Sequence, residues 1–595
     1  MTGVQTCALP ISTYDGLNHS VQRINNSFGA PDTVIDGLGN ITRYTYDCLG
    51  RLTSTIDAEG KTTYNYYDKL SRSKGANMPD ASSGYSYDGN SVDFLVEYDN
   101  VGNVTARKNA KAEVYYSYDD LSRATEVDSA SSTYPRVKYV YDTYSGTGYD
   151  TPSSPFNNPK GRLTSLITVG VDTTWYVYDK LGRIKKKVYR YAGMSGGRDS
   201  VLFDYNAMSA CTLLTYPDGS SIKYGINSMG RLYDVPGFIS SVTYTEASQP
   251  YYIYHTSHSM TEIFSYDNRL RPSYVTAKDI ELVFQLKLQY TYWQDGNIKK
   301  IQDYVNSSYT HYYDYTSPDS SYDALGRLQR CAVGSTVITY SYDDVGNRTQ
   351  EVLGGTTNSL SYTSGTNKIS SATVGGTTYS YVYDNAGNVT RRNWGFDSQD
   401  SYYYNYANML TSVYLDDGRW ITNYYGDGGS NKVKKTDSQT GSRYYAYNGI
   451  NPLCEYDSTG AIKRKYVYAF GKCIGVIDSA GRRYLYHHDA QGSIRLVVDT
   501  TGTVSNVYTY YPFGDSLNFT GTMKNELLFT GKPRVEGMDA YDFSARYYDP
   551  AIGRFYSIDP IFNPAVSPYA YCNNNPVNYV DPNGMAMIKH HYYDK

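Results

Sequence analysis

The stretch Tyr46-Asp47-Cys48-Leu49-Gly50-Arg51 decides the fold, because the chain repeats it many times. Each copy is a Tyr-Asp pair, two variable residues, a Gly, and then Arg or Asn. Successive copies, such as those at Tyr322 and Tyr342, lie about twenty residues apart, which indicates a structural repeat. The other full copies are Tyr98-Asp99-Asn100-Val101-Gly102-Asn103, Tyr178-Asp179-Lys180-Leu181-Gly182-Arg183, Tyr322-Asp323-Ala324-Leu325-Gly326-Arg327, Tyr342-Asp343-Asp344-Val345-Gly346-Asn347 and Tyr383-Asp384-Asn385-Ala386-Gly387-Asn388.

The phrase has the residue preferences of a tight turn. Asp at the first turn position and Gly at the fourth favour a type I turn, in which Gly supplies a positive φ. Alternating polar and apolar residues flank the phrase, and the clearest strand is predicted from Glu281 to Tyr292, with Leu282, Phe284 and Leu286 on one face. Each repeat is therefore predicted to be a strand–turn–strand unit. Since one hairpin is only marginally stable, neighbouring units are expected to pair into a continuous sheet.

The composition excludes several classes of protein. The 595 residues include 72 Tyr, 15 Phe and 4 Trp, and the formal net charge is −4. No apolar run reaches the roughly 18 residues of a membrane-spanning helix. The absence of a basic stripe argues against a nucleic-acid binder, and the many aromatic residues argue against disorder. A large, Tyr-rich, all-β protein remains.

Two other readings of the repeats stay open on composition. One is a tightly wound solenoid or propeller in which the Tyr residues fill an ordinary core. The other is a module that binds choline or sugars through aromatic cages. Such cages rely on Trp, and none of Trp175, Trp293, Trp394 and Trp420 lies within the Tyr-Asp phrase.

The first twelve residues, MTGVQTCALPIS, share nothing with the rest of the chain. Residues 2–11 look like the translation of a common sequencing adapter, so residues 1–12 are expected to be an artefact. The natural N-terminus and any export signal are then expected to be missing.

The repeats resemble the YD repeats of the Rhs family, which also occur in the C subunits of ABC toxin complexes and in teneurins. The resemblance is most specific after residue 481, where the chain is similar to the Rhs repeat-associated core. The phrases that carry it are His488-Asp489-Ala490-Gln491-Gly492-Ser493, Tyr511-Pro512-Phe513-Gly514, Phe529-Thr530-Gly531-Lys532, Ala545-Arg546-Tyr547-Tyr548-Asp549-Pro550, Gly553-Arg554-Phe555 and Asn573-Asn574-Asn575-Pro576.

The resemblance implies an all-β fold in which YD-repeat hairpins form a spirally wound, hollow β-shell. It assigns residues 13–480 to the repeat shell and residues 481–585 to the associated core that closes it. Residues 586–595 are then the remnant of a C-terminal variable region, which in bacterial members is a toxin enclosed by the shell. The resemblance also implies a secreted or cell-surface protein whose main partner is its own C-terminal effector.

Two Asp-Pro steps, Asp559-Pro560 and Asp581-Pro582, suggest chemistry at the C-terminal end. Two carboxylates held close together share one proton, so that one activates water while the other polarises a carbonyl group. Many Rhs proteins resemble this arrangement and cleave themselves just after the second step, in a phrase written Asp-Pro-x-Gly-Leu. Carried over to this chain, the cut falls between Met585 and Ala586.

The resemblance also gives a role to Arg546, which occupies the position of an arginine implicated in self-cleavage among toxin C subunits. A guanidinium group would hold one carboxylate ionised and oriented. The chain departs from the family pattern in two places: the first phrase lacks its usual Gly, and Met585 replaces the usual Leu. Alternatively, both Asp-Pro steps simply open turns.

Other site candidates in the sequence are weak. His255 and His258, or His487-His488-Asp489, could contribute metal ligands, but neither group belongs to a set of three or four convergent ligands. No Gly-rich phosphate loop is present. We therefore expect neither a metal nor a cofactor.

The sequence leaves two functions from different classes. The first is a fragment of an Rhs-type toxin shell that encapsulates an effector and cleaves itself as a single-turnover aspartic protease. The second is a non-enzymatic cell-surface protein for adhesion or carbohydrate binding, with exposed Tyr faces that stack on sugars. Secretion machinery and target-cell glycans are further expected partners, whereas nucleic acid is not. A relic shell that has lost its cargo is a third reading.

Overall fold

The computed structural model describes residues 11–14, 19–129, 135–144, 158–195, 199–256, 259–313, 321–395, 397–426, 431–561 and 563–589. These residues are almost all in antiparallel strands and turns, and they contain no α-helix. Accordingly, no described segment is a helix of the length and apolarity that crossing a membrane requires. The all-β fold class predicted from the repeats is confirmed. Residues 1–10 and 590–595, and with them most of the predicted adapter and C-terminal remnant, lie outside the described part.

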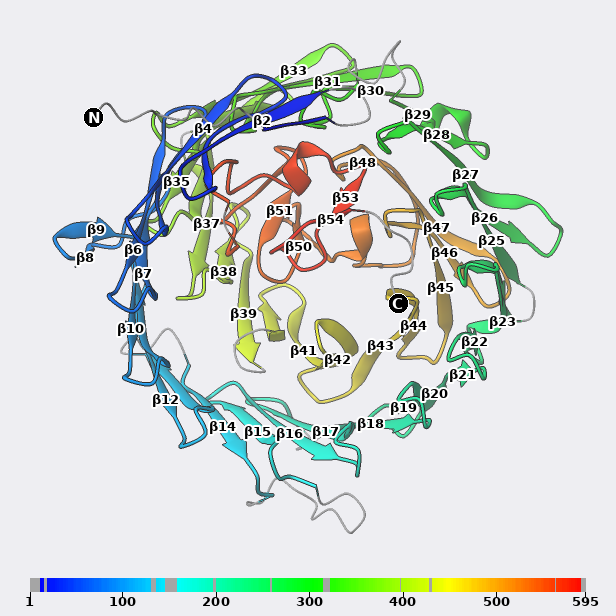
Figure 1. Cartoon of the computed structure of the whole chain (residues 1–595). Coiled ribbons are helices and arrows are strands. Elements are labelled where there is room, and N and C mark those ends of the chain that lie inside the picture. The colour runs from blue at the N-terminus through cyan, green and yellow to red at the C-terminus, as the bar shows by residue number, and fades with distance from the viewer. Residues whose placement is uncertain are drawn as a thin grey trace, which may run out of the picture.

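Two large sheets contain most of the strands. The first has 18 strands, from β1 (Ile11–Tyr14) to β20 (Ser221–Lys223), and the second has 26, from β23 (Ile239–Tyr244) to β48 (Ser516–Gly521). In the second sheet each strand pairs with its neighbours in the sequence, as tandem hairpins require. Figure 1 shows the strands following one another around a ring, with the yellow and gold strands β41 (Gly441–Asn448) to β47 (Val504–Tyr510) inside the cyan and green ones.

The Tyr-Asp phrase forms the turn between two strands, as predicted. Strand β4 (Ile41–Tyr46) ends at the Tyr, a bulge displaces the register there, and β5 (Leu52–Ile56) begins after the Arg. The side-chain oxygen Oδ1 of Asp47 accepts hydrogen bonds from the backbone N–H groups of Leu49 at 2.9 Å and Arg51 at 3.0 Å. Gly50 has a φ of 76°, which a residue with a side chain rarely adopts.

The same geometry recurs at the other complete phrases. The carboxylates of Asp179, Asp323, Asp343 and Asp384 each accept the N–H groups two and four residues further on. The corresponding Gly182, Gly326, Gly346 and Gly387 all have a positive φ. The Asp carboxylate and the Gly backbone thus shape the turn in the same way at each of these phrases.

The Tyr and Arg of the phrase join one repeat to the next. The hydroxyl of Tyr67, at the end of β6 (Thr62–Tyr67), donates to the carbonyl oxygen of Leu52 in the preceding repeat at 3.0 Å. The Arg51 guanidinium lies 4.9 Å from the centre of the Tyr67 ring and donates to the Asp68 carbonyl at 2.9 Å. Tyr178, Tyr322 and Tyr342 make the same kind of backward hydrogen bond. This ladder explains why Tyr, rather than Val or Leu, occupies the position.

The strand predicted from Glu281 begins later. Strand β27 covers Phe284–Tyr292, with Leu286, Leu288 and Tyr290 buried as expected. Residues 279–283 instead form a turn around Asp279, whose carboxylate accepts the N–H groups of Glu281 and Val283. Leu282 occupies the Gly position of this turn with a φ of 66° and its side chain is exposed, so the prediction that Leu282 lies in the strand on the same face as Leu286 is wrong.

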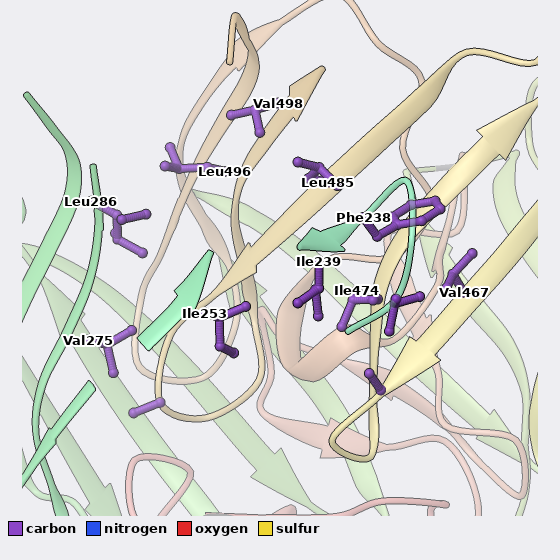
Figure 2. Close-up of a cluster of buried hydrophobic side chains, with 14 of the residues drawn as sticks. Phe238, Ile239, Ile253, Val275, Leu286, Val467, Ile474, Leu485, Leu496 and Val498 are labelled. Carbon is purple, nitrogen blue, oxygen red and sulfur yellow. The ribbon is translucent and has the colours of Figure 1, made fainter. Parts of the chain in front are cut away.

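The largest core lies between windings that are distant in the sequence. Figure 2 shows Ile239, Ile253 and Leu286 of the green strands in one cluster with Ile474 and Leu485 of the gold strands. The C-terminal part of the chain packs against repeat turns in the same manner. Arg554 donates to Asn347, and Asn574 and Asn575 donate to the carbonyl oxygens of Gly346 and Gly326.

Candidate active site

Three short hairpin segments inside the ring carry the predicted catalytic residues. Arg546 precedes β51 (Tyr547–Asp549), and its carbonyl oxygen accepts the N–H of Phe543 in a tight turn. Asp559 follows β52 (Arg554–Phe555), and Asp581 follows β53 (Tyr579–Val580). Strand β53 pairs with β54 (Ile588–Lys589), so residues 581–587 form the loop of a hairpin.

The structure brings the two aspartates to the same guanidinium nitrogen. Nη2 of Arg546 lies 2.9 Å from Oδ2 of Asp559 and 3.3 Å from Oδ2 of Asp581. Arg546 is 2% exposed and Asp581 is 3% exposed, whereas the Asp559 side chain is 22% exposed. The two carboxylates, 22 residues apart in the sequence, therefore form one cluster in which only Asp559 retains contact with solvent.

Asp581 and Arg546 also hold the loop that contains the predicted cleavage site. Oδ1 of Asp581 accepts the backbone N–H groups of Asn583 at 3.2 Å, Gly584 at 2.8 Å and Met585 at 3.2 Å. Nε of Arg546 donates to the Gly584 carbonyl oxygen at 2.5 Å. Met585 is half-buried and Ala586 is exposed, so the chain leaves the cluster between these two residues.

Burial changes the protonation of the cluster. Loss of solvent raises the pKa of Asp559 above its ordinary value, and the negative charge of Asp581 acts in the same direction, although Arg546 opposes both. Burial likewise lowers the pKa of Arg546, while the two carboxylates oppose that shift. A carboxyl group with a raised pKa retains its proton at higher pH, so Asp559 can carry a proton in this cluster.

Lys532 lies beside this site, although no role for Lys532 was predicted from the sequence. Its ammonium group donates to the Pro582 carbonyl oxygen at 2.5 Å, and burial lowers the pKa of Lys532. Lys532 and Asp581 line a cavity of about 750 Å³ that extends beside the hairpin loop. The phrase Phe529-Thr530-Gly531-Lys532 was a sequence signal for this region, but only the fold shows what Lys532 contacts.

The weak histidine candidates are only partly described. His258 lies outside the described residues. His255 and His487 lie near each other and near Glu262, an acidic residue that sequence reasoning missed because it is distant from His487 in the chain.

Comparisons with known proteins place the chain among YD-repeat proteins. Residues 237–577 match the teneurin YD-shell model, and residues 33–72 match the RHS repeat model. The nuclease WapA of Bacillus spizizenii, described as specific for a serine tRNA, is 26% identical over 261 residues, which cover 42% of this chain and 11% of WapA. Toxin subunit YenC2 of Yersinia entomophaga is 28% identical over 145 residues, which cover 23% of this chain and 15% of YenC2. The chain thus spans only a small part of these relatives.

Solved structures share the fold over nearly the whole chain. The crystal structure of TcdB2–TccC3 aligns with a TM-score of 0.65 at 17% identity, covering 96% of this chain and 35% of that one. The Photorhabdus luminescens Tc holotoxin pore gives the same TM-score and covers 95% of this chain and 33% of that one. Because the YD-shell model alone matches more than half of the chain, the chain belongs to the Rhs and teneurin family of YD-shell proteins.

Proposed function

We propose that this chain is the shell part of an Rhs-type toxin that encloses a C-terminal effector and cleaves itself between Met585 and Ala586. One observation carries the self-cleavage proposal: Arg546 contacts both Asp559 and Asp581, while Asp581 also holds the N–H of Met585. A carboxyl pair beside a peptide bond is the arrangement that aspartic proteases use.

In the proposed reaction, a water molecule adds to the carbonyl carbon of Met585. Asp581, oriented by Arg546, accepts the proton of the water as the new C–O bond forms. Asp559 donates its proton to the nitrogen of Ala586, and the C–N bond breaks. The products are a carboxylate at Met585 and a free amine at Ala586, and no co-reactant other than water is consumed.

Two observations support the proposal that the shell encloses an effector: the position of the last strands and the similarity to toxin proteins. In Figure 1, β50 (Ala540–Asp542), β53 and β54 lie inside the ring of strands, so a polypeptide that follows β54 starts from the inside. The similar proteins WapA and YenC2 are described as a nuclease and a toxin subunit. We further propose that this protein acts outside the cell that makes it, as a secreted or surface-attached protein.

The intact mass of the expressed chain tests self-cleavage. We expect wild type to lose the residues after Met585, and Asp559→Asn or Asp581→Asn to keep its full mass. Asp539→Asn is the matched control, because Asp539 is exposed and its carboxylate pairs with Arg534 at the surface of the same region. A wild-type chain that stays at full mass under all conditions, or an Asp559→Asn chain that is still cut after Met585, would refute the proposal.

Exposed tyrosines give some support to the second function, carbohydrate binding at a cell surface. Tyr403 of β37 (Ser398–Tyr404) and Tyr414 of β38 (Leu410–Tyr414) are both exposed, with ring centres 5.6 Å apart in an edge-to-face arrangement. Such rings stack on sugar faces. A glycan array probed with wild type and with Tyr403→Ala decides this reading: loss of a specific signal in the variant favours it, and no signal in wild type removes it.

A further inference from the structure

A buried cluster of two histidines and one glutamate lies where two windings of the second sheet, distant in the sequence, pack against each other. His255 ends β24 (Pro250–His255), Glu262 lies in β25 (Met260–Tyr266), and His487 lies in β45 (Arg483–His488). Each offers one donor atom, and the three donor atoms lie within 4.8 Å of one another. We propose that His255, Glu262 and His487 bind one divalent transition-metal ion, with Zn²⁺ the best match.

The surroundings of His255 prepare it as a ligand. Its Nδ1 lies 3.0 Å from the carbonyl oxygen of Phe238. Because a carbonyl oxygen can only accept, Nδ1 carries the proton and Nε2 carries the free lone pair. A backbone carbonyl that orients the second ring nitrogen in this way is the usual partner of a metal-bound histidine. Nε2 then lies 3.7 Å from Oε2 of Glu262.

His487 approaches the same glutamate from the other winding. Its Nδ1 lies 2.6 Å from Oε1 of Glu262, and its ring lies 4.9 Å from that of His255 with an angle of 79° between the planes. His255 is 2% exposed and His487 is 0% exposed. Nε2 of each ring is buried, and no group among the described residues hydrogen-bonds to either atom. Two unsatisfied buried nitrogens are costly unless a further group completes the site.

A small cavity adjoins the cluster. It has a volume of about 20 Å³ and is lined by His255, Glu262, His488 and Lys472, among others. That volume holds a single water molecule or ion and nothing larger. Lys472 is the competing cation at this place, since its charge also interacts with that of Glu262. Metal binding therefore has to be measured against a protein-only arrangement in which Lys472 balances the glutamate.

The chemistry of the donors selects the kind of metal. Two imidazole nitrogens and one carboxylate oxygen suit Zn²⁺, whereas Ca²⁺ and Mg²⁺ require oxygen ligands. Donors bound to one Zn²⁺ at about 2.1 Å lie roughly 3.4 Å apart. Nε2 of His255 and Oε2 of Glu262 are near that spacing at 3.7 Å, whereas Nδ1 of His487 and Oε1 of Glu262, now 2.6 Å apart, have to separate to admit the ion. Three protein ligands leave one position open for water.

Such an ion would join two windings of the wall. Glu262 and His487 are 225 residues apart in the sequence. Ile239 and Ile253 line the small cavity together with Glu262, and they share one hydrophobic cluster with Leu485 of the other winding (Figure 2). The proposed role is therefore structural, as a clamp that ties β24 and β25 to β45. It is independent of the proposed cleavage, and failure of one leaves the other standing.

Zinc titration of the full chain tests the site. After treatment with EDTA and dialysis, wild type is expected to bind one Zn²⁺ per chain by isothermal titration calorimetry and native mass spectrometry. Co²⁺ in its place is expected to give the visible absorption of a tetrahedral site. Glu262→Gln and His255→Gln are expected to weaken Zn²⁺ binding by at least about 10- to 100-fold. Losses of that size are typical even when the mutated residue only hydrogen-bonds to a metal ligand.

The matched control is His311→Gln, which alters another buried histidine of the same sheet that contacts Tyr313 instead of a carboxylate. Its Zn²⁺ affinity is expected to equal that of wild type. Circular dichroism verifies that each variant folds. If Glu262→Gln does not fold, thermal unfolding replaces the titration of that variant: Zn²⁺ is expected to raise the Tm of wild type and to leave the Tm of His255→Gln unchanged. Absence of Zn²⁺ binding by wild type would overturn the proposal and leave Lys472 as the counter-ion. So would Zn²⁺ binding by Glu262→Gln and His255→Gln that is as tight as that of wild type.

Discussion

The two aspartates of the candidate site differ in what surrounds them, and this difference fits the two roles that we propose for them. Asp581 is buried and accepts three backbone N–H groups, so its position is fixed by the loop that it holds. Asp559 has one backbone donor, Ile561, and a partly exposed side chain with a raised pKa. A fixed acceptor next to a proton carrier that exchanges with solvent is the pairing that general acid–base catalysis needs.

Asp93, far from this site, makes stability depend on pH. It is 6% exposed, and burial raises its pKa to about 6, with Asp80 adding to the shift and Lys368 opposing it. The native state thus binds this proton more tightly than the unfolded chain, so the contribution to stability is full below pH ~4 and falls as the pH rises to ~6. The total change is at most about 3 kcal/mol. Asp93→Asn removes the dependence while retaining an acceptor for the Met78 N–H.

Urea unfolding of wild type and Asp93→Asn at pH 4, 5, 6 and 7 measures this effect. The difference in unfolding free energy between the two is expected to shift in favour of Asp93→Asn by about 2 to 3 kcal/mol between pH 4 and pH 7. Asp539→Asn, at an exposed position, serves as the control and is expected to follow wild type. A difference between Asp93→Asn and wild type that is constant with pH would contradict the prediction.

At the scale of the element, the repeat turn could be predicted from the sequence because its determinants are local. The Asp47 carboxylate accepts a hydrogen bond from a residue four positions away, and Gly50 supplies the positive φ of the same turn. One strand–turn–strand interpretation therefore applies to every complete phrase. The turn at residues 279–283 was missed because Leu282 replaces Gly there. Its apolar side chain continued the alternation of β27, and no local signal distinguished an exposed Leu from a buried one.

The loop of the β53–β54 hairpin has a glycine that no other residue can replace without movement. Gly584 has a φ of 76°, and a Cβ atom there would lie 3.0 Å from the backbone nitrogen of Arg546 and 3.0 Å from the carbonyl oxygen of Phe543. Gly584→Ala is therefore expected to displace the loop from Arg546 and Asp581. We expect self-cleavage to slow by at least about 10-fold, which corresponds to about 1.4 kcal/mol.

The matched control is Gly481→Ala in the turn between β44 (Lys472–Asp478) and β45. Gly481 has a φ of 80°, but no described atom lies within 4 Å of its added Cβ. Both variants thus carry the same backbone strain, and only Gly584→Ala disturbs the site. The time course of cleavage by intact mass compares them, and equal rates for Gly584→Ala and wild type would show that the loop position is irrelevant to cleavage.

At the scale of the whole molecule, contacts between windings were beyond reach of the sequence. The resemblance supplied Asp559, Asp581 and Arg546 as a group, but Lys532 and Glu262 have partners that only the winding brings near. A repeat pattern specifies which strands pair in order. It does not specify which turn of the sheet faces which, because that depends on the accumulated twist of many strands.

Arg554 shows what such contacts contribute to the assembled chain. Buried in β52, it donates to the side chain of Asn347 at 2.8 Å and to the carbonyl oxygen of Asn367 at 2.7 Å, so it fastens the C-terminal part to two repeat turns. Arg554→Ala leaves those buried acceptors unpaired, at a cost of about 2 to 4 kcal/mol. Hydrogen exchange is expected to lose protection at residues 343–347 and 363–369 first, since the strands elsewhere keep their own neighbours. Arg482→Ala is the control: Arg482 pairs with Asp478 in an exposed turn, and its loss is expected to change hydrogen exchange only locally. If Arg554→Ala left these segments as protected as in wild type, the C-terminal part would not be what holds the turns in place.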